Sequence, residues 1–259
     1  MTRQLLRLIA LLVISLLSLQ LYFLARVALM RVVDPESTTF QRSEARRLIG
    51  EKHELLWSQR WVDYDRIAPS LKRAVIASED SAFIDHSGVE WDALEKAWER
   101  NQKAEARVEK INEQLDRRLQ KSGSAKAPPK AAARAVPKVV GGSTITQQLA
   151  KNLFLSGERS LVRKAQEFAI TFMLEACLSK QRILEIYLNN VEWGEGIFGA
   201  EAAARHYFHV GADRLGPMPA AQLAVMLPAP KRFEKRPGSA YVVGRAATVN
   251  ARMGAVELP

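Results

Sequence analysis

The chain has 259 residues, of which 47% are hydrophobic and 25% charged, and its formal net charge is +10. A chain of this length and composition can bury a core, which excludes a wholly disordered, collagen-like or disulfide-stapled protein. The positive charge favours an anionic partner. The single cysteine, Cys177, has no partner for an intrachain disulfide and cannot form a Cys-rich zinc site, so we expect no central role for thiol chemistry.

An apolar run without charges occupies residues 8–25, between Arg7 and Arg26. At about 1.5 Å per residue, a helix of this length nearly crosses a hydrocarbon core of roughly 30 Å. A cleaved signal peptide is the alternative, but the run is longer than the usual apolar region of one and lacks a clear cleavage site. We therefore predict a transmembrane anchor, with its N-terminal tip, over residues 1–33. Arginines flank both ends, so charge alone does not set the orientation.

After Asp34, apolar residues recur at spacings of three and four, which indicates a mostly helical protein with little strand-like alternation. We find no internal repeat. The helices predicted from this spacing cover residues 70–78, 145–154, 161–178, 181–190, 200–208 and 220–226.

A first candidate site lies at the end of the helix predicted over 70–78. Glu79 follows an apolar turn, where burial would raise its pKa and suit it to accept a proton near neutral pH. The alternative is a helix end with solvated acids. The residues that follow, Asp80, Asp85 and His86, lack a convincing metal-ligand spacing, and a lone histidine is more often structural.

The composition changes sharply between Glu99 and Lys138. A charged run with helical spacing, ERNQKAEARVEKINEQLDRRLQ, is followed by KSGSAKAPPKAAARAVPK. The second segment has few large apolar residues to bury, so we expect it to be flexible. We interpret residues 100–138 as an insertion that either occupies solvent or binds a partner or lipid headgroups.

The most informative stretch is GGSTITQQLAKN, residues 141–152. Its two glycines free the backbone just before Thr144, which can form a capping box with Gln147, so a helix should begin here. The first N–H groups of that helix would be free to bind an anion, beside a polar face made of Thr144, Gln147, Gln148 and Lys151. An ordinary capped amphipathic helix explains the pattern equally well.

Charged residues spaced by four come next: Arg159, Arg163 and Glu167, with Lys164 beside them. Arg163 and Glu167 could form a surface ion pair of small value. The residues after Glu167 are apolar, however, and a carboxylate in such surroundings is usually paired or functional. Glu167 is therefore the second candidate carboxylate.

One match to a known pattern is rejected. Residues 194–199 fit G-x-G-x-x-G, which is typical of dinucleotide binding. Such a site needs a strand before it and an acid about twenty residues later. Here a helical segment, ILEIYLNN, precedes the pattern, and Pro219 occupies the position of the acid.

Five motifs in order resemble those of the peptidoglycan glycosyltransferases of the class A penicillin-binding protein type, in their monofunctional form. They are E-D-x-x-F-x-x-H-x-G at 79–88, G-G-S-T-I-T-Q-Q-x-x-K-N at 141–152, R-K-x-x-E at 163–167, K-x-x-I-L-E-x-Y-L-N at 180–189, and a glycine turn that leads to Ala202-Ala203 and Tyr207-Phe208. The resemblance extends from about Trp57 to Phe208, apart from the insertion. No Ser-x-x-Lys is present and the chain stops soon after the last motif, so we expect no transpeptidase half.

The resemblance implies a mainly α, lysozyme-like glycosyltransferase domain over residues 34–259, with a small membrane-apposed lobe. It also implies the reaction: a glycan chain on undecaprenyl diphosphate is the donor, lipid II supplies the acceptor 4-hydroxyl, and a β-1,4 link forms with inversion. Glu79 would be the general base, and Glu167 would orient the site or hold a cation. The implied residues for substrate binding are Ser143, Thr144, Gln147, Gln148, Lys151, Asn152, Arg159, Arg163 and Lys164.

The same resemblance implies no tightly bound cofactor, although Mg²⁺ or Mn²⁺ at the diphosphate would suit the preference of hard cations for oxygen ligands. The implied partners are lipid II, the nascent glycan chain and the cytoplasmic membrane, with cell-wall synthesis or division proteins as candidates and no nucleic acid. The catalytic domain would lie on the outer, periplasmic side of the cytoplasmic membrane, with the N-terminus of the single-pass anchor in the cytoplasm.

The insertion is the main departure from the family, because it lengthens the interval between Glu79 and Gly141; Ile84 and Ser87 also replace residues that are often bulkier or aromatic. The nearest alternative function is a lysozyme-like hydrolase or lytic transglycosylase, which would use a protonated glutamate and have no need of cations beside its glycan cleft. An inactive membrane-anchored scaffold is the second alternative.

The excess positive charge is concentrated in two segments. Residues 1–33 hold four arginines and no acid, and residues 100–138 hold 11 basic and 4 acidic side chains. The rest of the chain is close to neutral. Anionic lipid headgroups are therefore a better match for the excess charge than nucleic acid.

Overall fold

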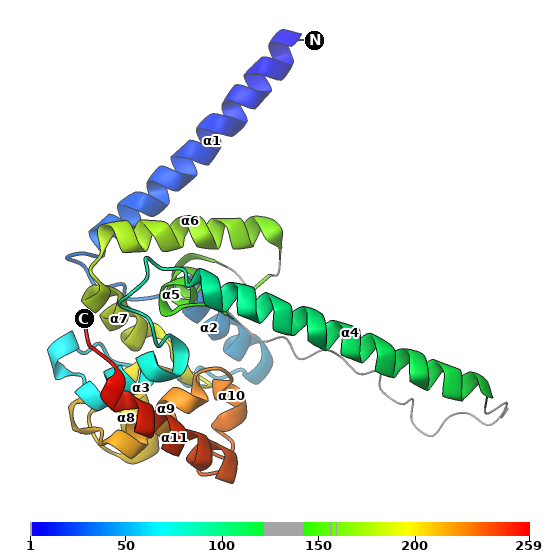
Figure 1. The fold of residues 1–259 in the computed structure, drawn as a ribbon. Helices are drawn as coiled ribbons and strands as arrows, with labels where there is room; N and C mark the ends of the chain where they lie inside the picture. Colours follow the sequence, from blue (N-terminus) through cyan, green and yellow to red (C-terminus); the bar gives the residue numbers. More distant parts are fainter. Residues whose placement is uncertain (1, 122–141, 156, 159) are drawn as a thin grey trace. The chain divides into compact units, whose positions relative to one another are not determined.

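The computed structural model describes residues 2–121, 142–155, 157–158 and 160–259. The chain forms two compact units, a larger one of Met1–Val89 with Thr144–Pro259 and a smaller one of Glu90–Ser143. Helices predominate in both (Figure 1). The predicted mainly α fold class is confirmed.

The first helix of the larger unit, α1 (Thr2–Leu29), contains the predicted anchor. Its most apolar 18-residue stretch has a mean hydropathy of 2.4, and among the described residues α1 is the one helix long and apolar enough to cross a membrane. Near its end, Gln20 exchanges hydrogen bonds of 2.8 and 3.0 Å with Gln166, and the ring of Phe23 packs edge-on against that of Phe154 at 5.3 Å. The helix fits a single-pass membrane anchor whose last turns contact the folded part of the unit.

The other α-helices of the larger unit are α2 (Thr39–Lys52), α3 (Pro69–Glu79), α5 (Ile145–Phe154), α6 (Leu161–Cys177), α7 (Lys180–Asn190), α8 (Ala200–Phe208), α9 (Pro217–Met226), α10 (Pro230–Phe233) and α11 (Ala240–Arg252). Short 3₁₀ helices lie at η1 (Tyr64–Arg66), η2 (Ala212–Arg214) and η3 (Met253–Ala255). The helices predicted from apolar spacing correspond to α3 and α5–α9, with α9 beginning earlier than expected. The helices α2, α10 and α11 were not predicted.

A small sheet joins distant parts of the larger unit. Its strands β1 (Ser58–Gln59), β2 (Glu192–Gly194) and β3 (Ile197–Phe198) lie in the order β1-β3-β2. The β2 and β3 strands pair antiparallel, and β1 pairs parallel with β3. The G-x-G-x-x-G pattern is thus a hairpin that leads into α8, which agrees with its rejection as a dinucleotide loop.

The core of the larger unit gathers around α7 and α9. Both α3 and α11 pack on α9. The largest fully buried side chains include Trp193, Tyr187, Phe83 and Phe198. The indole nitrogen of Trp193 donates to the carbonyl of Leu223 at 3.1 Å, so this large side chain is buried with its polar atom satisfied. As expected of a small hydrophobe, Cys177 packs partly buried against this core.

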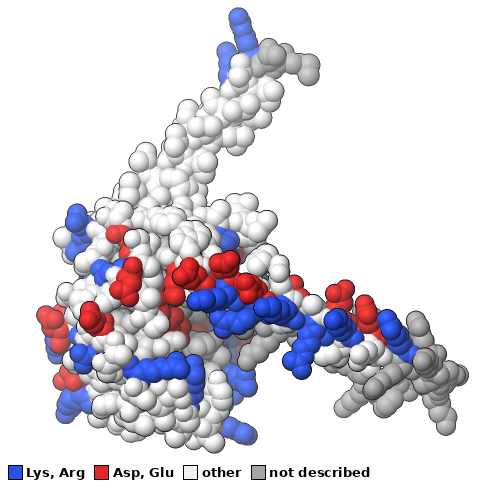
Figure 2. Space-filling view, in the orientation of Figure 1, with Lys and Arg blue, Asp and Glu red and all other residues white. Residues whose placement is uncertain are grey.

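The smaller unit contains one long helix, α4 (Trp91–Lys121). The predicted charged helix lies within it, although α4 begins before residue 100. Basic and acidic side chains are interspersed along its surface, as expected of a solvated helix (Figure 2). The Ala/Pro-rich part of the predicted insertion, residues 122–138, lies outside the described residues.

Gly196 provides a test of the hairpin. Its φ is +73°, and a Cβ there would lie 2.0 Å from the carbonyl oxygen of Leu56. We expect Gly196→Ala to lower the free energy of unfolding by about 1–3 kcal/mol or more, because both the backbone angle and the contact become unfavourable. Thermal unfolding of the full chain in detergent measures the effect.

Gly50→Ala, in α2, is the matched control. Nothing lies within 4 Å of a Cβ at this position. Alanine is the better helix former, so the melting temperature should stay the same or rise. Equal losses of stability in both variants would contradict the role given to Gly196.

Candidate active site

The predicted base, Glu79, is the last residue of α3. Its Oε2 accepts a hydrogen bond of 2.9 Å from Nε2 of Gln148 on α5, and Oε1 of Gln148 accepts one of 2.9 Å from the hydroxyl of Tyr187 on α7. Because an ionised carboxylate can only accept, the nitrogen of Gln148 must face Glu79 and its oxygen the tyrosine. This chain of contacts fixes the orientation of the carboxylate.

The surroundings of Glu79 shift its pKa upward. Burial raises the pKa of Glu79, the hydrogen bond from Gln148 lowers it, and the charge of Asp80 raises it, with a net shift upward. This direction agrees with the sequence-based expectation for a proton acceptor. Burial also raises the pKa of Tyr187 well above its usual value, and the charges of Glu79 and Asp80 add to the shift, so the tyrosine remains a neutral hydrogen-bond donor.

Asp80 is buried and holds the two helices of the site together. Its Oδ2 accepts the backbone N–H of Ile145, the first residue of α5, at 3.0 Å, and its Oδ1 lies 2.8 Å from Nε2 of His86. The other ring nitrogen of His86 accepts the N–H of Gly88 at 3.1 Å, which places a proton on Nε2, facing the carboxylate. Asp80 and His86 therefore form a structural pair that joins the end of α3 to the start of α5.

The start of α5 corrects one expectation. Thr144 and Gln147 form the predicted capping box, but both are buried, and the hydroxyl of Thr144 donates to the carbonyl of Gly88 at 2.6 Å. The expectation of free N–H groups is wrong for Ile145 and Gln147, because their N–H groups donate to Asp80 and to Thr144. The anion at the N-terminus of α5 is therefore the carboxylate of Asp80.

A cluster of charges lies at the start of α6. The Glu167 side chain is buried, with Oε2 accepting from Nη1 of Arg163 at 2.8 Å and Oε1 accepting from Nζ of Lys164. Glu167 is thus paired rather than solvated, which excludes the weak surface pair considered from the sequence. Nε of Arg163 is buried and has no hydrogen-bond partner among the described residues.

Lys151, on α5, supplies a third cation to this cluster. Its side chain reaches solvent and makes no hydrogen bond or ion pair within the described parts of the chain. Desolvation by the surrounding protein lowers the pKa of Lys151, the charge of Glu167 raises it, and the charges of Arg163 and Lys164 lower it. The cluster therefore holds more positive than negative charge and has an unpaired ammonium group for an anion.

For the other predicted binding residues, the structure gives only a position in the chain or a degree of burial. Asn152 is half-buried on α5. Ser143 is the last residue of the smaller unit. Arg159 lies outside the described residues. The substrate-binding roles of all the predicted residues stay predictions.

Sequence reasoning missed the supporting residues. Lys180 donates to the carbonyl of His86 at 2.6 Å and to Glu175 at 2.9 Å, and Glu175 also accepts from the hydroxyl of Thr146 at 2.6 Å. These contacts join the start of α7 to α5, α6 and the His86 turn. The available signal was the fourth motif, which begins at Lys180 and contains Tyr187.

The arrangement combines a carboxylate of raised pKa with an excess of cations, and α5 carries a residue of each group. Gln148 and Lys151 are three residues apart and so lie near each other on one face of this helix. A base can activate a hydroxyl nucleophile, and unpaired cations can stabilise a leaving group that departs with negative charge. The class of chemistry that suits this site is transfer of a group from an anionic carrier to a hydroxyl.

Comparisons with known proteins identify the family. The sequence pattern of the family described as Transglycosylase matches residues 49–131 and 125–254. The chain is 49% identical over 243 residues to a biosynthetic peptidoglycan transglycosylase from Burkholderia orbicola (strain MC0-3), covering 94% of this chain and 86% of the relative. It is 45% identical over 250 residues to a protein of the same name from Paraburkholderia xenovorans (strain LB400), covering 96% and 91%. The chain belongs to the transglycosylase family, which is a family of enzymes.

The Asp80 junction yields a stability prediction. In Asp80→Asn, one of the two buried donors that face Asp80 would meet an amide N–H₂ group instead of an oxygen. We expect a loss of about 1–3 kcal/mol in the free energy of unfolding, the cost of an unsatisfied buried donor. Thermal unfolding measures it, with Asp85→Asn as the control because Asp85 is exposed. A melting temperature equal to that of the control would contradict the structural role of Asp80.

Proposed function

We propose that this protein is a peptidoglycan transglycosylase that polymerises lipid II into β-1,4-linked glycan strands. The observation that carries the proposal is the pairing, through α5, of a partly buried, oriented glutamate with a cluster of excess positive charge. The names of the relatives support peptidoglycan as the polymer. The absence of a Ser-x-x-Lys motif from the sequence supports glycosyl transfer without transpeptidation.

In the proposed reaction, Glu79 takes the proton of the acceptor 4-hydroxyl as that oxygen attacks the anomeric carbon of the donor. The new carbon–oxygen bond forms on the face opposite to the departing diphosphate, so the configuration inverts. A diphosphate leaves as an anion and needs no proton. Lys151, Arg163 and Lys164 would stabilise its charge, and Glu167 would hold Arg163 and Lys164 in place.

A resident metal ion is not part of this mechanism. Both carboxylate oxygens of Glu167 are engaged by cationic side chains. Among the described residues, no three metal-ligating side chains gather at one place. These contacts support a proposal in which a Mg²⁺ or Mn²⁺ ion enters as a companion of the substrate diphosphate.

The proposed location is the outer face of the cytoplasmic membrane, with the N-terminus in the cytoplasm. The last turns of α1 contact α6, the helix that carries the cation cluster, through Gln20 and Gln166. Two exposed apolar side chains, Leu161 and Val162, lie at the start of the same helix. These contacts support a membrane-apposed lobe in which the cations meet a lipid-linked diphosphate near the headgroups.

The decisive experiment incubates the purified full chain with labelled lipid II and follows long glycan products. We expect Glu79→Gln to lower turnover by roughly 10²–10⁴-fold, because an amide cannot accept the hydroxyl proton. Glu54→Gln is the control, since Glu54 is exposed and far in sequence from the motifs. Unreacted lipid II together with shortening of finished glycan would instead indicate a lytic enzyme, and full turnover in Glu79→Gln would refute the base assignment.

The contact between Gln148 and Glu79 predicts a pH effect. Glu79 can act as a base only when deprotonated, so activity should fall as the pH drops below its raised pKa. The hydrogen bond from Gln148 lowers that pKa. In Gln148→Met the pKa should rise further, and the acidic limb of the pH profile of kcat/KM should move to higher pH. Gln181→Met, at an exposed position of α7, is the control. An unshifted limb in Gln148→Met would contradict the coupling.

A further inference from the structure

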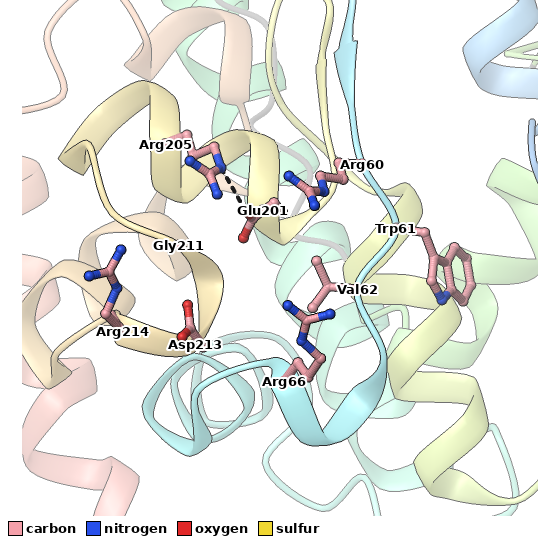
Figure 3. A pocket seen from close by; sticks show the side chains of 9 residues that line it. All are labelled: Arg60, Trp61, Val62, Arg66, Glu201, Arg205, Gly211, Asp213 and Arg214. Atoms are coloured by element: carbon pink, nitrogen blue, oxygen red, sulfur yellow. Dashed lines mark hydrogen bonds and ion pairs between the residues drawn. The ribbon is translucent and has the colours of Figure 1, made fainter.

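A second group of cations lines a cavity of about 390 Å³ that includes none of the predicted site residues. It lies between the segment from β1 to η1 and the segment from α8 to η2 (Figure 3). The charged residues that line it are Arg60, Arg66, Arg205, Arg214, Glu201 and Asp213. Arg60 and Arg66 come from one segment and the other charged residues from the other.

One of the two acids that line the cavity, Glu201, is committed to contacts within the protein. Glu201 is buried, and its Oε1 accepts from Nε of Arg205 at 2.6 Å while its Oε2 accepts the backbone N–H of Ala212 at 2.7 Å. The contact with Ala212 and the charges of Arg205 and Arg60 hold the pKa of Glu201 below its usual value, against the effect of burial. Glu201 therefore acts as an ionised support for the turn between α8 and η2.

The guanidinium groups of the other three arginines that line the cavity are available to a ligand. Within the described residues, the side chains of Arg60, Arg66 and Arg214 make no hydrogen bond or ion pair. Four arginines against two acids leave an excess of two positive charges around the cavity. Each guanidinium carries a planar fork of N–H donors that matches the oxygens of a carboxylate or a phosphate.

We propose that this cavity binds a compact polyanion that carries at least two oxyanion groups. The unpaired arginines come from both walls (Figure 3), so a ligand with more than one negative group can pair with both. The volume of about 390 Å³ is ample for a small organic polyanion and excessive for a single monovalent ion. Carboxylate and phosphate ligands share this chemistry.

The test is isothermal titration calorimetry, in which the full chain in detergent is titrated with citrate and, separately, with inorganic pyrophosphate. We expect at least one of them to bind, and acetate to bind far more weakly. Preference for citrate would identify a carboxylate ligand, and preference for pyrophosphate a phosphorylated one. In Arg66→Gln/Arg214→Gln the affinity should fall at least about tenfold, since each arginine contributes charge-assisted hydrogen bonds.

Two controls separate this cavity from other sources of anion binding. Arg245→Gln/Arg252→Gln removes the same charge from exposed positions of α11 and should leave the affinity unchanged. Lys151→Gln removes a cation of the proposed active site and should also leave citrate binding unchanged. A failure of the cavity to bind anions would therefore say nothing against the proposed function. The inference is overturned if neither polyanion binds, or if the α11 variant loses as much affinity as the cavity variant.

Discussion

The buried carboxylate of Asp80 is the constraint on which the candidate site depends. A buried charge is costly unless donors surround it, and Asp80 has the N–H of Ile145, the ring of His86 and the positive end of the α5 dipole. These donors come from segments separated by many residues in the sequence. Since Glu79 is the neighbour of Asp80, the same contacts fix the backbone that carries the proposed base.

The position of α5 then sets the geometry of the rest of the site. Gln148 lies one turn into this helix, where it reaches Glu79, and Lys151 follows almost one turn later, beside Glu167. The two positions differ by about 4.5 Å along the axis, three residues at 1.5 Å each. A base and a cation cluster held by one rigid helix need little rearrangement when a substrate binds, which is the condition for electrostatic preorganisation.

The sequence predicted what is local and missed what is brought together from a distance. The bounds of α5 follow from two glycines, a capping box and an apolar stripe, all within residues 141–154. The partner of its first N–H group, Asp80, lies 65 residues earlier, and no local sequence pattern predicts this contact. Tyr187 occupies an apolar position of a helix, so periodicity alone assigns it to the core. The helix α2 has only Gln41 and Leu48 buried, too few apolar contacts to produce a clear period.

The shifts in pKa on the two sides of the site have a common meaning. Burial raises the pKa of Glu79 and lowers that of Lys151, so the free protein holds both groups in surroundings that disfavour their charged forms. In the proposed reaction, the proton from the acceptor hydroxyl would neutralise the unfavourable charge of Glu79. The diphosphate would pair with the ammonium group of Lys151 and so stabilise its charged form. Interactions that improve as charge develops favour the transition state over the free enzyme, which is how such opposed shifts contribute to catalysis.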